Sequence, residues 1–131
     1  MQPSAAAPEP ETLRVLLIED NPLDARLIQI MIAEAGAGQF ELERVERVTE
    51  GLERLKQGDI GLVLVDLSLP DSHGIETFET VHSAFPKTPI IVMSGMDDQA
   101  VAVRAVHEGA QDFLVKGHVN GLLLVRARRR G

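Results

Sequence analysis

The chain has 131 residues, of which 44% are hydrophobic and 25% charged, and its formal net charge is −7. That length allows one domain with a core of its own, but not two. The acidic balance argues against nucleic acid as a partner, and the absence of cysteine excludes disulfides and thiolate metal sites. No apolar run approaches the ~20 residues that cross a bilayer, and no secretory signal opens the chain, so we expect a soluble, cytoplasmic protein.

Short apolar runs alternate with segments of helical period along most of the chain. Residues 1–12 are rich in alanine, proline and glutamate without periodicity and are predicted to be a disordered leader. One folded domain is predicted over residues 13–131. The predicted strands are residues 13–19, 40–46, 61–66, 88–94 and 111–115. The predicted helices are approximately residues 22–35, 49–57, 74–85 and 97–108, followed by a basic segment, 120–130.

Four of the predicted strands are apolar on both faces, as strands buried inside a parallel sheet must be. The second strand, FELERVE, alternates between apolar and charged residues and is therefore predicted at an edge of the sheet. Strict alternation of strands and helices indicates the α/β class, with a doubly wound parallel sheet that carries helices on both faces.

Several predicted strands end in polar residues, at the edge of the sheet where parallel sheets bind their ligands. Glu19 and Asp20 end the first strand, and Asp66 ends the third. Three carboxylates at one edge would repel one another unless a cation lay among them, so the sequence predicts a site for Mg²⁺. Ser94 ends the fourth strand and Lys116 follows the fifth, which supplies a hydroxyl donor and a cation suited to phosphoryl oxygens.

Asp66 is not needed as a turn residue, because Pro70, Asp71 and Gly74 already supply the turn chemistry of the loop that follows it. We therefore interpret Asp66 as a nucleophile that accepts a phosphoryl group. A metal ion would screen the charge that otherwise keeps a carboxylate away from a phosphoryl donor.

With these residues at successive strand ends, the chain from Leu13 onward resembles the receiver domain of two-component response regulators. The resemblance implies a flavodoxin-like fold with a five-stranded parallel sheet in the order 2-1-3-4-5. It also implies that Asp66 is the phosphoacceptor and that Asp66 and Asp20 bind Mg²⁺ directly. Glu19 would bind the metal through a water molecule, and Ser68 through its backbone carbonyl.

The same resemblance implies further roles near the phosphoryl group. Ser94 and Lys116 would contact the phosphoryl oxygens. Ser94 and Phe113 would form the switch, in which the aromatic ring turns inward as the hydroxyl moves to meet the phosphoryl group. Ser68 and Met96, each two residues beyond a site residue, would tune the rate of dephosphorylation.

The partners implied by the resemblance are a phosphoryl donor and a receiver of the signal. The donor would be a histidine kinase or a phosphotransfer protein. A second receiver or an output domain would bind through the fourth helix, fifth strand and last helix. The protein would catalyse its own phosphorylation and dephosphorylation without being a turnover enzyme. The sequence leaves open whether the chain is a stand-alone regulator or the receiver segment of a larger kinase or cyclase.

Two features depart from the family pattern. Most receivers have proline after the lysine, joined by a cis bond, whereas this chain has Lys116-Gly117. Without proline a cis bond costs about 2.5–4 kcal/mol, so we expect a trans bond. The last predicted helix, from Gly121, is short and ends in arginines rather than a finished cap, as expected of a chain cut from a longer protein. In that case the partner face formed with this helix would be incomplete.

Three other classes of protein can be weighed against this interpretation. A flavodoxin-like cofactor binder needs a loop rich in glycine and hydroxyl groups after its first strand, where this chain has IEDNPLD. A haloacid-dehalogenase-type phosphatase needs a second aspartate at the position of Ser68. A non-phosphorylated pseudo-receiver that acts as an interaction module is the remaining alternative, although Asp20, Asp66 and Lys116 are all present.

Overall fold

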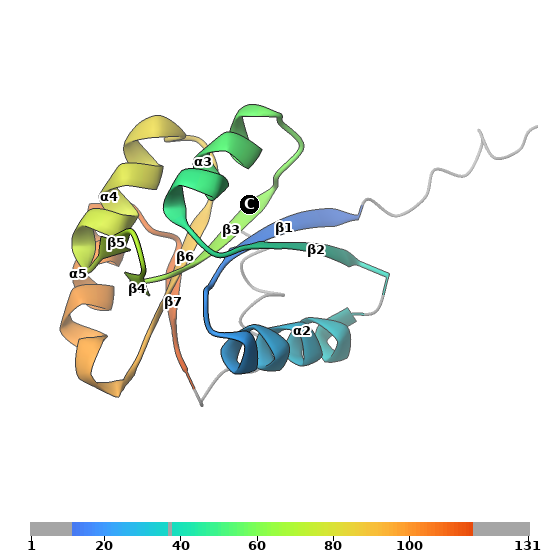
Figure 1. Ribbon diagram of the computed structural model, residues 1–131, viewed down its shortest axis with the longest axis horizontal. Coiled ribbons are helices and arrows are strands. Elements are labelled where there is room, and N and C mark those ends of the chain that lie inside the picture. Colours follow the sequence, from blue (N-terminus) through green and yellow to red (C-terminus); the bar gives the residue numbers. More distant parts are fainter. Residues whose placement is uncertain (1–11, 37, 117–131) are drawn as a thin grey trace, which may run out of the picture.

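The computed structural model describes residues 12–36 and 38–116, which form one parallel β-sheet with helices on both faces (Figure 1). Neighbouring strands are parallel throughout, in the order β2-β1-β3-β6-β7. Numbered along the chain, this is the order 2-1-3-4-5, so the predicted fold class and strand order are confirmed. The strands of the sheet are β1 Leu13–Ile18, β2 Phe40–Val45, β3 Leu62–Asp66, β6 Ile90–Ser94 and β7 Asp112–Val115.

The helices divide unequally between the two faces of the sheet. In the described part of the chain, α2 covers one face, and α3, α4 and α5 cover the other (Figure 1). None of these helices is both long and apolar enough to cross a membrane. The predicted leader, apart from Thr12, and the predicted last helix lie outside the described residues. The helices are α2 Pro22–Gly36, α3 Val48–Lys56, α4 Ile75–Ala84 and α5 Gln99–Glu108, with a 3₁₀ turn, η1 Met96–Asp98, before α5.

Two apolar clusters fill the space between the sheet and its helices. Along β3, Val63 and Val65 pack towards α3, α4 and α5, whereas Leu62 and Leu64 pack towards α2. Successive side chains of a strand point to opposite faces, so a strand covered on both sides is apolar throughout. The same alternation decides which face each polar residue at a strand end belongs to.

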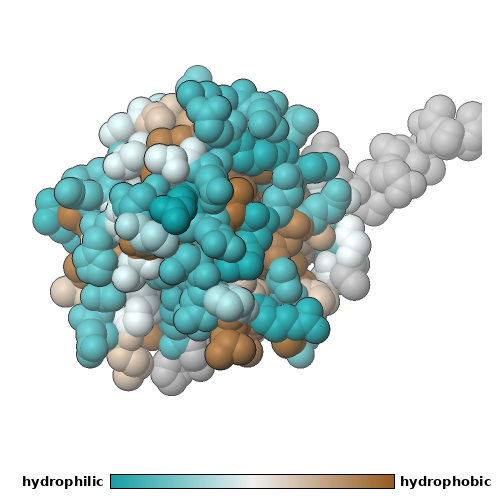
Figure 2. Space-filling model, in the orientation of Figure 1, coloured by the Kyte–Doolittle hydropathy of each residue, from teal (hydrophilic) through white to brown (hydrophobic). Residues whose placement is uncertain are grey.

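Helix α2 buries one side and leaves apolar side chains on the other. Leu23, Leu27 and Ile30 are among the most exposed large hydrophobic residues of the described chain. In Figure 2 hydrophilic side chains cover most of the visible face, and hydrophobic ones gather over α2 at the lower edge. This helix therefore presents an apolar surface beside the edge of the sheet.

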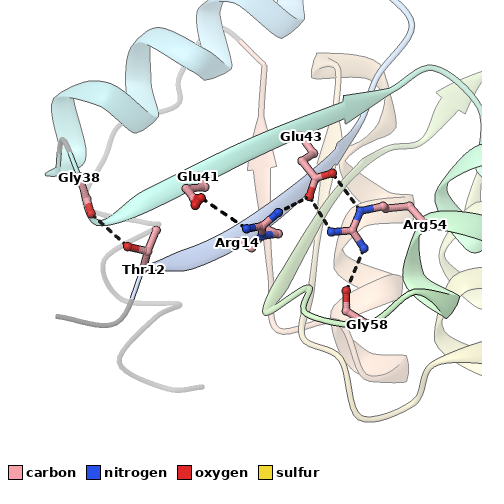
Figure 3. Close-up of polar contacts among 7 residues, drawn as sticks. All are labelled: Thr12, Arg14, Gly38, Glu41, Glu43, Arg54 and Gly58. Atoms are coloured by element: carbon pink, nitrogen blue, oxygen red, sulfur yellow. Dashed lines mark hydrogen bonds and ion pairs between the residues drawn. The ribbon is translucent and has the colours of Figure 1, made fainter. Parts of the chain in front are cut away.

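Charged side chains cover the edge strand β2, as its alternating sequence predicts (Figure 3). Arg14 of β1 lies 3.4 Å from Glu41 and 3.2 Å from Glu43. Arg54 of α3 pairs with Glu43 at 2.8 Å and donates a hydrogen bond to the carbonyl of Gly58. Arg54, helped by Arg14, holds the pKa of Glu43 below its usual value. Exposed pairs of this kind contribute about 0–1 kcal/mol each, and the charges also protect an open edge from pairing with another chain.

A small hairpin that the sequence did not predict follows β3. Its strands, β4 Ser68–Leu69 and β5 Ser72–His73, are antiparallel and only two residues long. The backbone N–H of Gly74 donates to the carbonyl of Leu67 at 2.7 Å and closes the hairpin. Gly74 has a φ of 70°, a left-handed conformation that favours glycine. Strands this short have no readable periodicity, which is why pattern analysis missed them.

Asp71 lies at the tip of this hairpin and caps a helix that begins 23 residues earlier in the sequence. Its carboxylate oxygens accept hydrogen bonds from the backbone N–H groups of Val48, at 3.0 Å, and Thr49, at 3.1 Å. Arg47, which precedes α3, supplies no side-chain cap of its own. Burial alone would raise the pKa of Asp71, but the N–H groups of Val48 and Thr49 outweigh it and hold the pKa below its usual value.

We expect Asp71→Ala to lower the free energy of unfolding by about 1 kcal/mol, because α3 loses its cap. Since the pKa of Asp71 is depressed in the folded protein, this contribution is present above the ordinary aspartate pKa of about 3.9 and is lost as the pH falls through the lower folded-state value. Urea denaturation should therefore show a difference between parent and variant at neutral pH that shrinks as the pH falls below about 3.9.

Asp71→Asn is the matched control for this measurement. The amide keeps one oxygen acceptor for the helix N-terminus but does not titrate. It should retain more of the free energy of unfolding than Asp71→Ala at neutral pH. A difference between Asp71→Ala and the parent that stays constant as the pH falls would contradict the assigned cap.

Candidate functional site

The carboxyl ends of β1 and β3 bring two buried carboxylates side by side. Ile18 is in register with Val65, so the residues that follow them, Glu19 and Asp66, are neighbours at the edge of the sheet. Glu19 is fully buried and Asp66 is 4% exposed. Glu19, Asp20 and Asp66 each offer an oxygen atom within 4.8 Å of the others. The structure therefore brings the three predicted acidic residues together in one carboxylate cluster.

The ammonium group of Lys116 lies against this carboxylate cluster. Its Nζ is 2.9 Å from Glu19 Oε1 and 3.0 Å from Asp66 Oδ2. A third carboxylate, Asp24 of α2, lies 2.8 Å from the same nitrogen. Burial alone would lower the pKa of Lys116, but Asp24, Glu19 and Asp66 outweigh it and hold the pKa above its usual value. Lys116 is thus a permanently charged group at the site.

Strand alternation explains why these groups meet. Glu19, Asp66 and Lys116 each stand two positions after a leucine of the cluster that packs beneath α2, which places all three on that side of the sheet. Asp24 belongs to the first turn of α2 and reaches them from above the same face. The three leucines are Leu17, Leu64 and Leu114.

Glu19 is the most strongly perturbed acid of the site. Burial raises the pKa of Glu19 to about 7, and the charge of Asp66 adds to this effect. Lys116 and the backbone N–H of Asn21, which donates to Glu19 Oε2 at 3.2 Å, act in the opposite direction. A carboxylate that is costly to ionise is stabilised by a further cation, so this environment is suited to binding one.

The carboxylate cluster fits Mg²⁺ by its chemistry. Mg²⁺ prefers oxygen ligands, usually a few carboxylates together with water molecules. Glu19, Asp20 and Asp66 could hold it, and Ser68, whose backbone carbonyl is the fourth predicted ligand, starts β4 two residues after Asp66. The ammonium of Lys116 occupies one side of this cluster, so any metal ion would share the oxygens of Glu19 and Asp66 with it.

Ser94 contributes a buried hydroxyl at the end of β6. It is fully buried, and its Oγ has no hydrogen-bond partner among the described residues. Its carbonyl accepts a hydrogen bond of 2.8 Å from the N–H of Lys116, which fixes the two strand ends against each other. A buried hydroxyl without a partner is unfavourable by about 1–3 kcal/mol, and a ligand oxygen could satisfy it.

The other predicted residues lie further from the buried groups. Phe113 is half-buried and packs against the apolar cluster on the side of α3, α4 and α5. Ser68 is exposed at the start of β4. Met96 is 63% exposed in η1, where its carbonyl accepts a hydrogen bond from the side chain of Gln99. The roles predicted for these three residues remain predictions.

Sequence reasoning missed two residues that shape the site. Asp24 was not singled out, because an acidic residue is ordinary in a first helical turn; strand alternation, which puts Lys116 on the same face as α2, was the signal that could have found it. Arg44 passed as one of the alternating charges of β2. Its guanidinium donates to the backbone carbonyls of Glu19, at 2.9 Å, and Asp20, at 3.1 Å, and so fixes the loop that carries both acids. No signal in the sequence distinguishes Arg44 from its charged neighbours.

Known proteins of similar sequence include response regulators. The closely similar relatives include the cell cycle transcriptional regulator CtrA of Caulobacter vibrioides, 36% identical over 104 residues, which are 79% of this chain and 44% of that protein. The cell cycle response regulator CtrA of Brucella ovis is 34% identical over 114 residues, 87% of this chain and 48% of that protein. The chain therefore spans about half the length of these relatives.

Solved structures share the fold. Full-length FixJ from B. japonicum superposes with a TM-score of 0.78 and 25% identity, over 92% of this chain and 59% of that one. A response regulator receiver domain protein from Clostridium thermocellum superposes with a TM-score of 0.76 and 24% identity, over 90% of this chain and 92% of that one. The family model for the response regulator receiver domain matches residues 15–128. The chain belongs to this family, the receiver domains of two-component signalling systems.

Proposed function

We propose that this chain is a phosphoacceptor receiver. Asp66 takes a phosphoryl group from a histidine kinase or a phosphotransfer protein in a Mg²⁺-dependent reaction, and the protein then changes conformation to signal to a partner. The observation that carries this proposal is the buried Asp66 beside the ammonium of Lys116, 3.0 Å away, within the carboxylate cluster. That arrangement supports a role for Asp66 as the nucleophile, with Lys116 as the nearby cation.

The transfer itself needs little from the protein beyond position and charge. A carboxylate oxygen of Asp66 forms the new bond to phosphorus, while the bond from phosphorus to the donor's leaving atom breaks and its electron pair stays with the leaving group. When bound by the carboxylate cluster, Mg²⁺ supplies the charge that lets an anionic nucleophile approach an anionic phosphoryl group. Lys116 supplies a second positive charge for the phosphoryl oxygens.

The response to phosphorylation would pass through Ser94. Its hydroxyl lacks a partner among the described residues and is free to donate to a phosphoryl oxygen. Phe113 lies in register with Val92, two residues before Ser94, so the ring is close to any movement at the end of β6. Phosphorylation would shift the population of two existing conformations rather than create a new fold.

The surface formed by α5, β7 and the segment that follows them would change on phosphorylation. A second receiver or an output domain could bind this surface. The relatives that the chain matches are about twice as long, and those of Caulobacter vibrioides are named as transcriptional regulators. An attached output module is therefore part of the proposal. As a signalling module, the protein would catalyse its own phosphorylation and dephosphorylation without turning over a separate substrate.

The direct test of this function is phosphorylation by acetyl phosphate with and without Mg²⁺, measured by intact mass. We expect the parent protein to gain one phosphoryl group only with Mg²⁺, and Asp66→Asn to gain none, because an amide oxygen is a poor nucleophile. Asp71→Asn removes an aspartate from the same loop and should still be phosphorylated. Phosphorylation of Asp66→Asn at the parent's rate would sink the assignment, and an unreactive parent would favour the pseudo-receiver.

Ser94→Ala should separate phosphorylation from the switch. We expect the variant to be phosphorylated on Asp66 while the NMR signals of the Phe113 ring no longer shift, because the hydroxyl that links the two events is gone. Loss of an unpartnered buried hydroxyl should not lower the free energy of unfolding, because removal of its uncompensated desolvation favours the folded state by up to about 1–3 kcal/mol. Ser83→Ala, at an exposed position of α4, is the control. A Phe113 response equal to the parent's in Ser94→Ala would show that the hydroxyl is not the link.

Met96→Glu should shorten the lifetime of the phosphorylated protein. A carboxylate at this position can orient water for attack on phosphorus, whereas a thioether holds water poorly. One such hydrogen bond is worth about 0.5–1.5 kcal/mol, so we expect decay about two- to tenfold faster after the phosphodonor is removed. Val103→Glu adds the same charge at another exposed apolar position and should decay at the parent's rate. Equal decay in Met96→Glu would assign the lifetime to other residues.

A further inference from the structure

Among the described residues, Asp24 is the one carboxylate in contact with Lys116 that lies outside the carboxylate cluster. Its Oδ2 is 2.8 Å from the ammonium nitrogen. This contact has the geometry of a hydrogen bond, and Glu19 and Asp66 lie 2.9 and 3.0 Å from the same nitrogen. The three donors of the ammonium are therefore shared between α2 and the carboxylate cluster.

Asp24 is held in place by the capped first turn of α2. Asn21 accepts hydrogen bonds from the backbone N–H groups of Leu23, at 2.9 Å, and Asp24, at 3.2 Å, and so caps α2 directly at this residue. The next residue, Ala25, is 2% exposed and anchors the helix in the core. The backbone of Lys116 is fixed by the hydrogen bond from its N–H to the carbonyl of Ser94, but its ammonium stands at the end of a flexible four-carbon side chain. A carboxylate on a capped helix can therefore position the ammonium.

The position of the ammonium matters because it shares oxygens with the proposed metal. Lys116 contacts Glu19 and Asp66, and both belong to the carboxylate cluster. If the ammonium of Lys116 contacted only those oxygens, it would compete with Mg²⁺ for them. Asp24 offers the ammonium an acceptor at the outer rim, where a groove of about 240 Å³ opens along α2. The ammonium can then remain beside Asp66 while the oxygens of the carboxylate cluster bind a metal ion.

We propose that Asp24 is a positioning residue that holds the ammonium of Lys116 at the rim of the carboxylate cluster. By doing so it limits the competition between Lys116 and Mg²⁺ and keeps the ammonium within reach of a phosphoryl group on Asp66. The inference rests on the proposed phosphoacceptor function, in which the carboxylate cluster binds Mg²⁺. In this proposal a residue of α2, and not only residues at strand ends, contributes to the site by positioning the ammonium.

The test is a Mg²⁺ titration followed by NMR chemical shifts, with acetyl phosphate kinetics at saturating Mg²⁺ as the second measurement. Asp24→Ala should weaken Mg²⁺ binding about fivefold and slow phosphorylation by a similar factor. Asp24→Glu keeps the carboxylate and should recover most of both. Glu34→Ala removes a carboxylate from the same helix and groove, and should leave both values unchanged. Equal effects of Asp24→Ala and Glu34→Ala would overturn the proposal.

A double-mutant cycle separates positioning from a general effect of charge. If Asp24 acts through the lysine, Asp24→Ala should change Mg²⁺ affinity by less than about twofold when Lys116→Met is already present. If Asp24 only adds negative charge near the metal, the same fivefold loss should appear in both backgrounds, and the proposal fails.

Asp20→Asn distinguishes failure of this inference from failure of the proposed function. It removes a direct ligand and should abolish the titration while leaving the core untouched. A titration that Asp20→Asn leaves unchanged would overturn the metal site and the inference together. Loss of binding in Asp20→Asn with no effect of Asp24→Ala would overturn the positioning role alone.

Discussion

The site depends on the ion pairs that keep buried carboxylates together at the carboxyl end of the sheet. Glu19 and Asp66 are withdrawn from solvent and lie close together, which is unfavourable for two ionised acids. The ammonium of Lys116 offsets this cost in the structure, at 2.9 and 3.0 Å from the two groups. A single charge does not neutralise three acids, and the raised pKa of Glu19 shows that repulsion and burial persist. Residual negative charge of this kind is what a divalent cation binds.

The two faces of the parallel sheet also separate Asp66, the proposed phosphoacceptor, from the residues proposed to carry the conformational signal. Asp66 continues the row of Leu62 and Leu64 on the face of α2, whereas Ser94 continues the row of Ile90 and Val92 on the opposite face. Phe113 packs on that second face as well. A movement of Ser94 towards a phosphoryl group would therefore draw on the packing beneath α3, α4 and α5, and not on α2. The face that binds the lysine and the face that would carry the signal are different sides of one sheet.

The sequence was sufficient for the fold because its strongest signals are local. Runs that are apolar on both faces predicted the buried strands, and the alternating FELERVE placed β2 at the edge, both as observed. Strand ends then identified the acidic residues and Lys116 as neighbours, since parallel strands end at one edge. The hairpin after β3 was missed because it has two residues per strand and is held by contacts with distant residues. The 3₁₀ turn η1 similarly delayed the start of α5 from Asp97 to Gln99.

What the sequence could not supply were the side chains that hold the site residues from elsewhere in the fold. Arg44 acts on two carbonyls across 24 and 25 residues, Asp71 on a helix 22 and 23 residues away, and Asp24 on a lysine 92 residues away. Their chemical types are ordinary for an edge strand, a turn and a first helical turn, so only tertiary geometry reveals them. Arg44 and Asp24 fix backbone or charge next to the carboxylate cluster, whereas Asp71 fixes the start of α3. The backbone of Lys116 is fixed at the end of β7, but its side chain is long and flexible, so in the proposed role a carboxylate on α2 positions its ammonium.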